Sequence, residues 1–130
     1  MNKYFAKIIA SDQEGLQMIS VCSSAAKVKI SDIKYLASNK VFLLLIERIK
    51  VENENEDKKV NSVVRFDFIS KVRSKNIDQS NQEAVLELVG IDYLKNNNVY
   101  EINLIFNNNA HIVLSTEIIE ARLVDQDEIK

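Results

Sequence analysis

The hydrophobic pattern changes its period once along this chain of 130 residues, and that change constrains the fold more than any other feature. Leu16, Ile19 and Cys22 recur at three-residue spacing, which predicts one face of an amphipathic helix. From Ile33 onward, apolar and polar residues alternate in short segments, which predicts strands that bury one face. We therefore expect an α+β fold in which one N-terminal helix accompanies a largely antiparallel sheet.

The predicted helix has a signal at each end. Ser11 and Glu14 form the pattern of a capping box, in which a hydroxyl and a carboxylate bind the free amides of the first turn. Lys27 and Lys29 bring cations to the other end, where they stabilise the carboxyl end of a helix dipole. The sequence therefore predicts a helix over about residues 11–28.

Six or seven strands are predicted around this helix. The run at residues 41–51 begins as a continuous apolar sequence, which is typical of a strand covered on both faces. The charged segment at residues 52–59 is expected to be a solvated loop. The predicted strands are residues 4–10, 33–37, 41–51, 62–74, 84–94, 99–106 and 110–115.

Asparagine stands where hairpin turns would normally have glycine. Tight hairpins need a residue with positive φ, but the chain has only Gly15 and Gly90. Asparagine is the non-glycine residue that adopts the left-handed region most readily. We therefore expect the Asn triplets at residues 96–98 and 107–109 to form hairpin turns, within a meander or a partly closed barrel.

The segment at residues 116–125 fits two interpretations. Thr116 could cap a short helix that buries Ile119 and Leu123, or the same residues could form a strand, and the cap favours the helix. With a closing helix, the strand count resembles the pleckstrin-homology barrel, a likeness of fold that implies no ligand. The chain has no proline, repeat or break in composition, so we expect a single domain over residues 1–130.

Charge and cysteine content limit the classes of function. The formal net charge of −2 argues against a dedicated nucleic-acid binder, which is normally basic. Cys22 is the only cysteine, so no disulfide forms within the chain, as expected in a reducing compartment. The longest apolar run, residues 41–46, is far shorter than the roughly 20 residues of a membrane helix. The N-terminus lacks the apolar segment of a signal peptide, so we expect a cytoplasmic protein.

The sequence lacks the usual motifs for metals, nucleotides and catalysis. Cys22 and His111 cannot supply the four ligands of a structural zinc site. Gly15 and Gly90 are too far apart to form a phosphate-binding loop. His111 has no partner pair for nucleophilic catalysis that its spacing would reveal. We therefore predict no metal, no cofactor and no catalytic residue, and we favour a function other than catalysis.

The stretch RFDFISKVRSKN, which starts at residue 65, carries the cations that a binding site would need. As a single strand it would direct Phe66 and Phe68 into the core and its charged side chains outward. The outward row consists of Arg65, Asp67, Lys71, Arg73 and Lys75. The row could bind an anion or be only the solvated face of a strand. The second interpretation is favoured, because the aromatic side chains lie on the other face from the cations.

We expect a non-enzymatic binding or protein-interaction module, whose partner is a protein or a small anionic ligand and which could form homo-oligomers. The alternative is a small-ligand binder or an enzyme with an unfamiliar site near Arg65, Arg73 and His111. The candidate binding residues are Arg48, Arg65, Asp67, Lys71, Arg73 and His111.

Three short patterns carry a resemblance to a known family. They are an Arg-Phe pair, a Val-x-Ser-x-x-Ile-Asp stretch and a closing segment at residues 118–125. The matching residues are Arg65, Phe66, Val72, Ser74, Ile77, Asp78, Glu120, Ala121, Leu123 and Asp125. In these residues the chain resembles domain of unknown function 2948, a small family found largely in alphaproteobacteria. The family has no activity to carry over, so the resemblance implies a stand-alone cytoplasmic bacterial domain and no particular chemistry.

Overall fold

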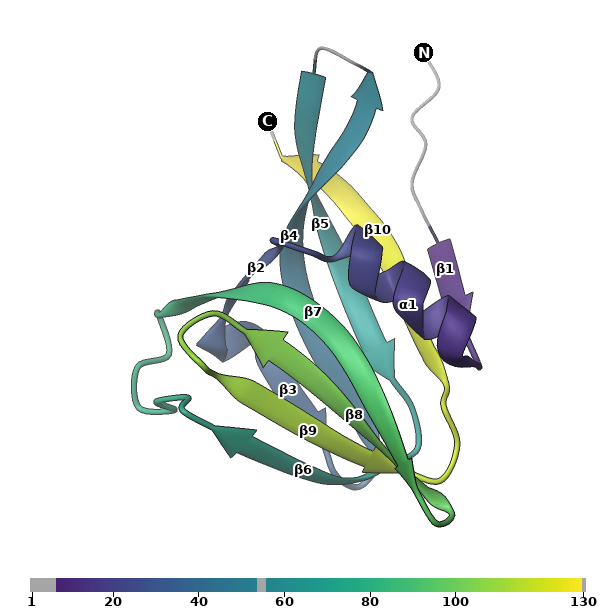
Figure 1. The fold of residues 1–130 in the computed structure, drawn as a ribbon. Helices are drawn as coiled ribbons and strands as arrows, with labels where there is room; N and C mark the ends of the chain where they lie inside the picture. The colour runs from purple at the N-terminus through teal and green to yellow at the C-terminus, as the bar shows by residue number, and fades with distance from the viewer. Residues whose placement is uncertain (1–6, 54–55, 130) are drawn as a thin grey trace.

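The computed structural model of the protein describes residues 7–53 and 56–129, with side chains described at residues 7–49 and 59–126. These residues contain one α-helix, one 3-10 turn and ten β-strands (Figure 1). The helix is α1 (Gln13–Cys22) and the 3-10 turn is η1 (Ile30–Asp32). The strands are β1 (Lys7–Ala10), β2 (Lys27–Lys29), β3 (Ile33–Leu36), β4 (Val41–Asn53), β5 (Glu56–Phe66), β6 (Ile69–Lys75), β7 (Val85–Asn96), β8 (Val99–Phe106), β9 (His111–Thr116) and β10 (Ala121–Ile129).

The ten strands form one antiparallel sheet that curls around a core and stays open. Nine of them pair in the order β1-β10-β5-β4-β2-β7-β8-β9-β6, and β3 pairs with β4 outside this path. The end strands β1 and β6 do not pair with each other, and Figure 1 shows them on opposite sides of the molecule. The α+β class and the antiparallel sheet are confirmed, whereas the predicted count of six or seven strands is too low.

Two strands beyond the seven predicted, β2 and β10, come from segments whose conformation is set by distant partners. Lys27–Lys29 is not the end of the helix but strand β2, which pairs with β4 and β7. The favoured C-terminal helix is wrong, because Ala121–Ile129 is strand β10, which pairs with β1 and β5. The expected loop at residues 52–59 is largely strand, since β4 continues to Asn53 and β5 begins at Glu56.

The helix is shorter than predicted and has a different cap. Its N-cap is Asp12, whose Oδ1 accepts a hydrogen bond of 2.8 Å from the backbone N–H of Gly15, so Ser11 is not the cap. The helix ends at Cys22, and Ala25 then adopts a φ of 65°. The Ala25 N–H donates to the carbonyl of Leu88 over 2.8 Å, which starts the approach of β2 to β7.

The stretch that was expected to be one strand is two. β5 ends at Phe66 and β6 begins at Ile69, with Phe68 between them at a φ of 61°. Phe66 is buried as predicted, but the inward orientation predicted for Phe68 is wrong, because its side chain is 54% exposed. The break separates the two halves of the charged row, since β5 and β6 are not neighbours in the sheet.

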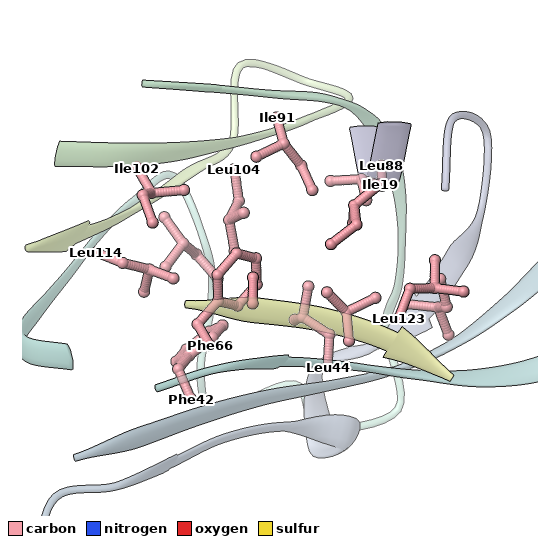
Figure 2. Packing of buried hydrophobic residues seen from close by; sticks show 14 of the residues in the cluster. Ile19, Phe42, Leu44, Phe66, Leu88, Ile91, Ile102, Leu104, Leu114 and Leu123 are labelled. Atoms are coloured by element: carbon pink, nitrogen blue, oxygen red, sulfur yellow. The ribbon is translucent and has the colours of Figure 1, made fainter. Parts of the chain in front are cut away.

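The core lies inside the curl of the sheet and is closed at one side by α1. Phe42 and Phe66 face each other across the β4–β5 pair, with their ring centroids 6.3 Å apart. Figure 2 shows them beside Leu104 and Leu114 of the far strands, with Ile19 of α1 approaching from the helix side. The helix thus buries its apolar face against the same core as the strands.

The asparagine triplets turn the chain as predicted. Asn97 has a φ of 57° between β7 and β8, and Asn108 and Asn109 have φ values of 59° and 58° between β8 and β9. Both segments join antiparallel neighbours. Within the described parts of the chain, no helix has the length and apolar character that crossing a bilayer requires.

Candidate functional site

The structure does not bring the six candidate binding residues together. Arg48 lies on β4, where it is buried, and Arg65 and Asp67 lie at the end of β5 and just beyond it. The other three lie on the far side of the strand order, at the opposite end from β1. They are Lys71 and Arg73 of β6 and His111 of β9.

Arg48 belongs to a buried ion pair. Its Nε donates to Asp125 Oδ1 over 2.9 Å and its Nη2 to Asp125 Oδ2 over 2.6 Å. Ser62 Oγ also donates to Asp125 Oδ1, over 2.6 Å. The two charged side chains are 7% and 0% exposed. This arrangement joins β4, β5 and β10 and leaves the guanidinium inaccessible to a ligand.

Arg65 and Asp67 form a second charged cluster on the surface. Arg65 Nε donates to Asp67 Oδ1 over 2.9 Å, and Arg122 Nη2 of β10 lies 3.6 Å from Asp67 Oδ2. Arg65 and Arg122 are direct neighbours in the pairing of β5 with β10. Asp67 therefore neutralises part of the positive charge of two adjacent arginines.

The cations of β6 lie beside a pocket. Lys75 pairs with His111 in the β6–β9 register, and Arg73 pairs with Val113, which in turn pairs with Asn103 of β8. These neighbours line a pocket of about 290 Å³ on the outer face of β6, β9 and β8. Its lining residues are Arg73, Ser74, Lys75, Asn103, His111 and Val113.

Arg73 is the residue of this pocket that has a carboxylate partner. Its Nη2 donates to Glu101 Oε2, while Lys71 and Lys75 have no ion-pair partner within the described residues. Asn103, which the sequence did not single out, lines the pocket, and its buried Oδ1 accepts no hydrogen bond from any described residue. In a strand that alternates apolar and polar residues, the sequence does not distinguish an asparagine with a buried side-chain oxygen from an asparagine that is fully solvated.

A second pocket lies on the other side of β6, where the sheet stays open. Among the described strands, β3 pairs only with β4 and β6 only with β9, so each has one edge without a strand partner. The space between these edges is a slot of about 260 Å³. Its lining residues are Ile30, Ile33, Tyr35, Phe42, Val72, Ser74, Ile77, Gln79, Gln82 and Ile112. Phe42 and Ile112 are buried, so the floor of the slot is the core itself.

The slot between β3 and β6 is closed at both ends. At one end, the Ile69 N–H donates to the carbonyl of Lys40 and the Tyr35 hydroxyl donates to the carbonyl of Ile69, each over 2.8 Å. At the other end, the loop between β6 and β7 crosses to η1, and the Ser31 N–H donates to the carbonyl of Gln82 over 3.0 Å. The slot is therefore a bounded feature of the fold, open along the side that faces solvent.

A larger groove of about 630 Å³ lies where β2 leaves β4, but its chemistry is less distinctive. Its two lysines are paired, with Lys27 Nζ 3.4 Å from Glu87 and Lys29 Nζ 3.5 Å from Glu83. Its described polar side chains show no buried atom without a hydrogen-bond partner. We therefore regard β6, with a pocket on each side, as the candidate functional site.

One acidic side chain near β6, that of Asp78, has a shifted pKa. Ser80 donates both its hydroxyl and its backbone N–H to Asp78 Oδ1, over 2.6 and 3.0 Å, and this lowers the pKa of Asp78. Asp78 lies in the loop that bounds the slot, next to Ile77 and Gln79. In the described residues, no group of three or more His, Cys, Asp or Glu side chains could hold a metal ion.

Comparison with known proteins gives one match. No curated protein and no solved structure matches the chain. A family model described as protein of unknown function (DUF2948) matches residues 6–130, which include the strands of both pockets. The resemblance seen in the sequence is thereby confirmed, and the chain belongs to the DUF2948 family.

Proposed function

We propose that this domain is a non-enzymatic protein-interaction module that binds an extended segment of a partner along the free edge of β6. The observation that carries the proposal is the slot between β3 and β6, where two unpaired strand edges face each other above the core. We place the module in the cytoplasm, in keeping with a chain whose only cysteine is Cys22.

The free edge of β6 can supply main-chain hydrogen bonds. β6 pairs with β9 on one side through the register from Lys71 to Lys75. In an antiparallel pair every second residue directs its N–H and C=O away from the neighbour, so these groups are unpaired on the outer edge. Addition of a strand to such an edge is a common way to bind an extended peptide, with affinity from the backbone and specificity from side-chain pockets.

The two sides of β6 predict the side chains of the bound segment. Val72 faces the slot, and a volume of about 260 Å³ with Phe42 and Ile112 at its floor suits one or two apolar side chains. Lys71, Arg73 and Lys75 lie on the other face and are exposed. They favour acidic side chains through complementary charge. The segment should therefore alternate apolar and acidic residues.

The same lysines suppress unwanted pairing. Cations on an edge strand discourage association with a second copy of the same edge, because like charges would face each other. Ser70 also interrupts the ladder as a bulge, and its Oγ donates to the carbonyl of Ser115 over 3.1 Å. The usable edge is therefore short and selective for a partner of opposite charge.

The test is a titration of the isotope-labelled chain with a synthetic peptide of about eight residues that alternates Val and Glu. The control is the same peptide with N-methyl groups on the amides that would face β6, which removes the donors and keeps the side chains. We expect the amide signals of residues 71–75 to shift with the first peptide only. Equal binding of both peptides would show that strand addition is not the mode of binding.

A matched pair of variants tests whether the peptide binds in the slot. Val72→Arg would place a charged side chain in the slot and should abolish peptide binding. Val89→Arg adds the same charge at an exposed position of β7 and should leave binding unchanged. Thermal unfolding of both variants checks that they fold, and retained binding by folded Val72→Arg would refute the proposal.

A further inference from the structure

The pocket on the outer face of β6, β9 and β8 has the composition of a small-anion site. Arg73 and Lys75 of β6, Asn103 of β8 and His111 of β9 line it together, within a volume of about 290 Å³. That volume is just below the range of about 300–1,000 Å³ for drug-sized ligands, so it suits a smaller molecule. Two of its residues, Arg73 and Lys75, also face the acidic side chains of the segment proposed above, whereas Asn103 and His111 have no role in that strand addition.

The charge in this pocket is not fully neutralised. Glu101 pairs with Arg73 through Nη2, and the other guanidinium donors of Arg73 stay available, since arginine has five. Lys75 and its neighbour Lys71 have no ion-pair partner among the described side chains. An oxyanion that enters the pocket would therefore meet a planar arginine fork and a lysine ammonium, both of which bind phosphate and carboxylate oxygens.

Asn103 adds a requirement that a simple anion does not meet. Its Oδ1 is buried and accepts no hydrogen bond from the described residues. Buried polar atoms are nearly always satisfied in native proteins, because the loss of hydration is not otherwise compensated. An amide oxygen only accepts, so the group that satisfies it must donate an O–H or N–H.

We infer that this pocket binds a small oxyanion that carries a hydroxyl group next to its charge. Arg73 and Lys75 bind the phosphate or carboxylate oxygens, and Asn103 Oδ1 accepts a hydrogen bond from the ligand hydroxyl. His111 lies beside Lys75 and contributes a ring nitrogen at the border of the pocket. Hydroxy acids and polyol phosphates have this combination of groups at a suitable size.

Four ligands in two matched pairs test the inference on the intact chain. Glycerol phosphate and glycerate carry hydroxyl groups, whereas propyl phosphate and propionate have the same oxyanions and carbon number without them. Dissociation constants come from isotope-labelled titrations followed at the side-chain amide of Asn103. We expect the hydroxylated member of at least one pair to bind about tenfold more tightly than its partner, as a hydrogen bond in a charged site warrants.

Comparison of the two pairs identifies the oxyanion. Tighter binding of glycerol phosphate identifies a phosphate site, and tighter binding of glycerate identifies a carboxylate site. The inference is overturned if none of the four ligands binds, or if the hydroxyl makes no difference in either pair.

Three variants assign the roles of the side chains. Asn103→Leu should remove the preference for the hydroxylated ligand and keep the weak binding of the plain oxyanion. Arg73→Gln should weaken the binding of the hydroxylated ligand and of the plain oxyanion by about tenfold or more. Arg122→Gln is the matched control, because its side chain is 42% exposed, against 49% for Arg73, and lies on β10. Thermal unfolding checks each variant, and Asn103→Ala replaces Asn103→Leu if the larger side chain prevents folding. The inference is overturned if Arg73→Gln and Arg122→Gln lose the same amount of ligand affinity.

Discussion

Arg48 and Asp125 lie 77 residues apart in the sequence and form a bidentate ion pair inside the fold, with N···O distances of 2.9 and 2.6 Å. Ser62 Oγ completes the arrangement by donating to the same carboxylate. Because these residues lie on β4, β10 and β5, the pair joins three adjacent strands of the sheet. Its cost of desolvation is offset only while both charges are present.

We therefore expect Arg48→Met to lower the free energy of unfolding by about 3–5 kcal/mol, because it removes one partner of a buried ion pair. Urea denaturation followed by circular dichroism measures the change. Arg122→Met is the control, since Arg122 pairs with Asp67 at the surface over 3.6 Å and should contribute about 1 kcal/mol or less. Similar losses in the two variants would contradict a structural role for the buried pair.

The two glycines should respond differently to alanine. A Cβ at Gly15 would lie 2.8 Å from the Cα of Ala10, so α1 and β1 would have to move apart. A Cβ at Gly90 would meet only the Oγ of Ser20, at 3.7 Å. We expect Gly15→Ala to destabilise the fold by about 1–3 kcal/mol and Gly90→Ala to be tolerated. Thermal or urea unfolding of both variants checks this, and equal stability would argue against the close contact.

The turn between β7 and β8 should depend on one asparagine of its triplet. Asn97 has a φ of 57°, whereas Asn98 does not have a positive φ. We expect Asn97→Ala to cost about 1 kcal/mol and Asn98→Ala to cost less. Asn97→Gly should be neutral or stabilising, since glycine adopts positive φ without strain. The urea midpoints of the three variants give the order of their stabilities. Equal losses of stability in Asn97→Ala and Asn98→Ala would contradict the prediction.

The carboxyl of Asp78 should titrate according to its contact with Ser80. The hydroxyl and backbone N–H of Ser80 stabilise the charged form and lower the pKa of Asp78. We expect Ser80→Ala to raise that pKa toward the ordinary value and Ser80→Thr to keep it low. Carbon NMR of the side-chain carboxyl over a pH series measures both.

The effect on stability follows from the sign of this shift. Because the pKa of Asp78 is lower in the folded state, its stabilising contribution is present above the pKa of the unfolded chain. It is lost as the pH falls through the folded value. In Ser80→Ala this acid-dependent part of the stability should shrink, and an unchanged pH profile would contradict the assignment.

Local physical chemistry made part of the fold predictable. Leu16 and Ile19 mark the buried side of α1, and both are buried in the structure. Asn97 and Asn109 adopt the left-handed conformation that the scarcity of glycine led us to expect. These outcomes depend on neighbours within a few residues, which the sequence displays directly.

The C-terminal segment shows where such reasoning stops. Ile119 and Leu123 have the spacing of a helix face, while Ala121, Leu123 and Asp125 have the spacing of a strand face. Both patterns are present in the same residues, and pairing with β1 and β5 selects the strand. The break at Phe68 is similar, because Asp67 N–H donates to the carbonyl of Glu120 over 2.8 Å, far along the chain.

The sequence by itself determined the family, the α+β class, the helix, the hairpin turns and the candidate cations Arg73 and Lys71. Only the tertiary structure decided that Arg48 is buried beside Asp125 and that β6 faces β3 across an open slot. It also decided that Asn103 lines the same pocket as Arg73 and Lys75, with an oxygen that accepts no hydrogen bond from the described residues. The reason is that burial and strand pairing join residues far apart in the chain, whose partners the local pattern does not specify.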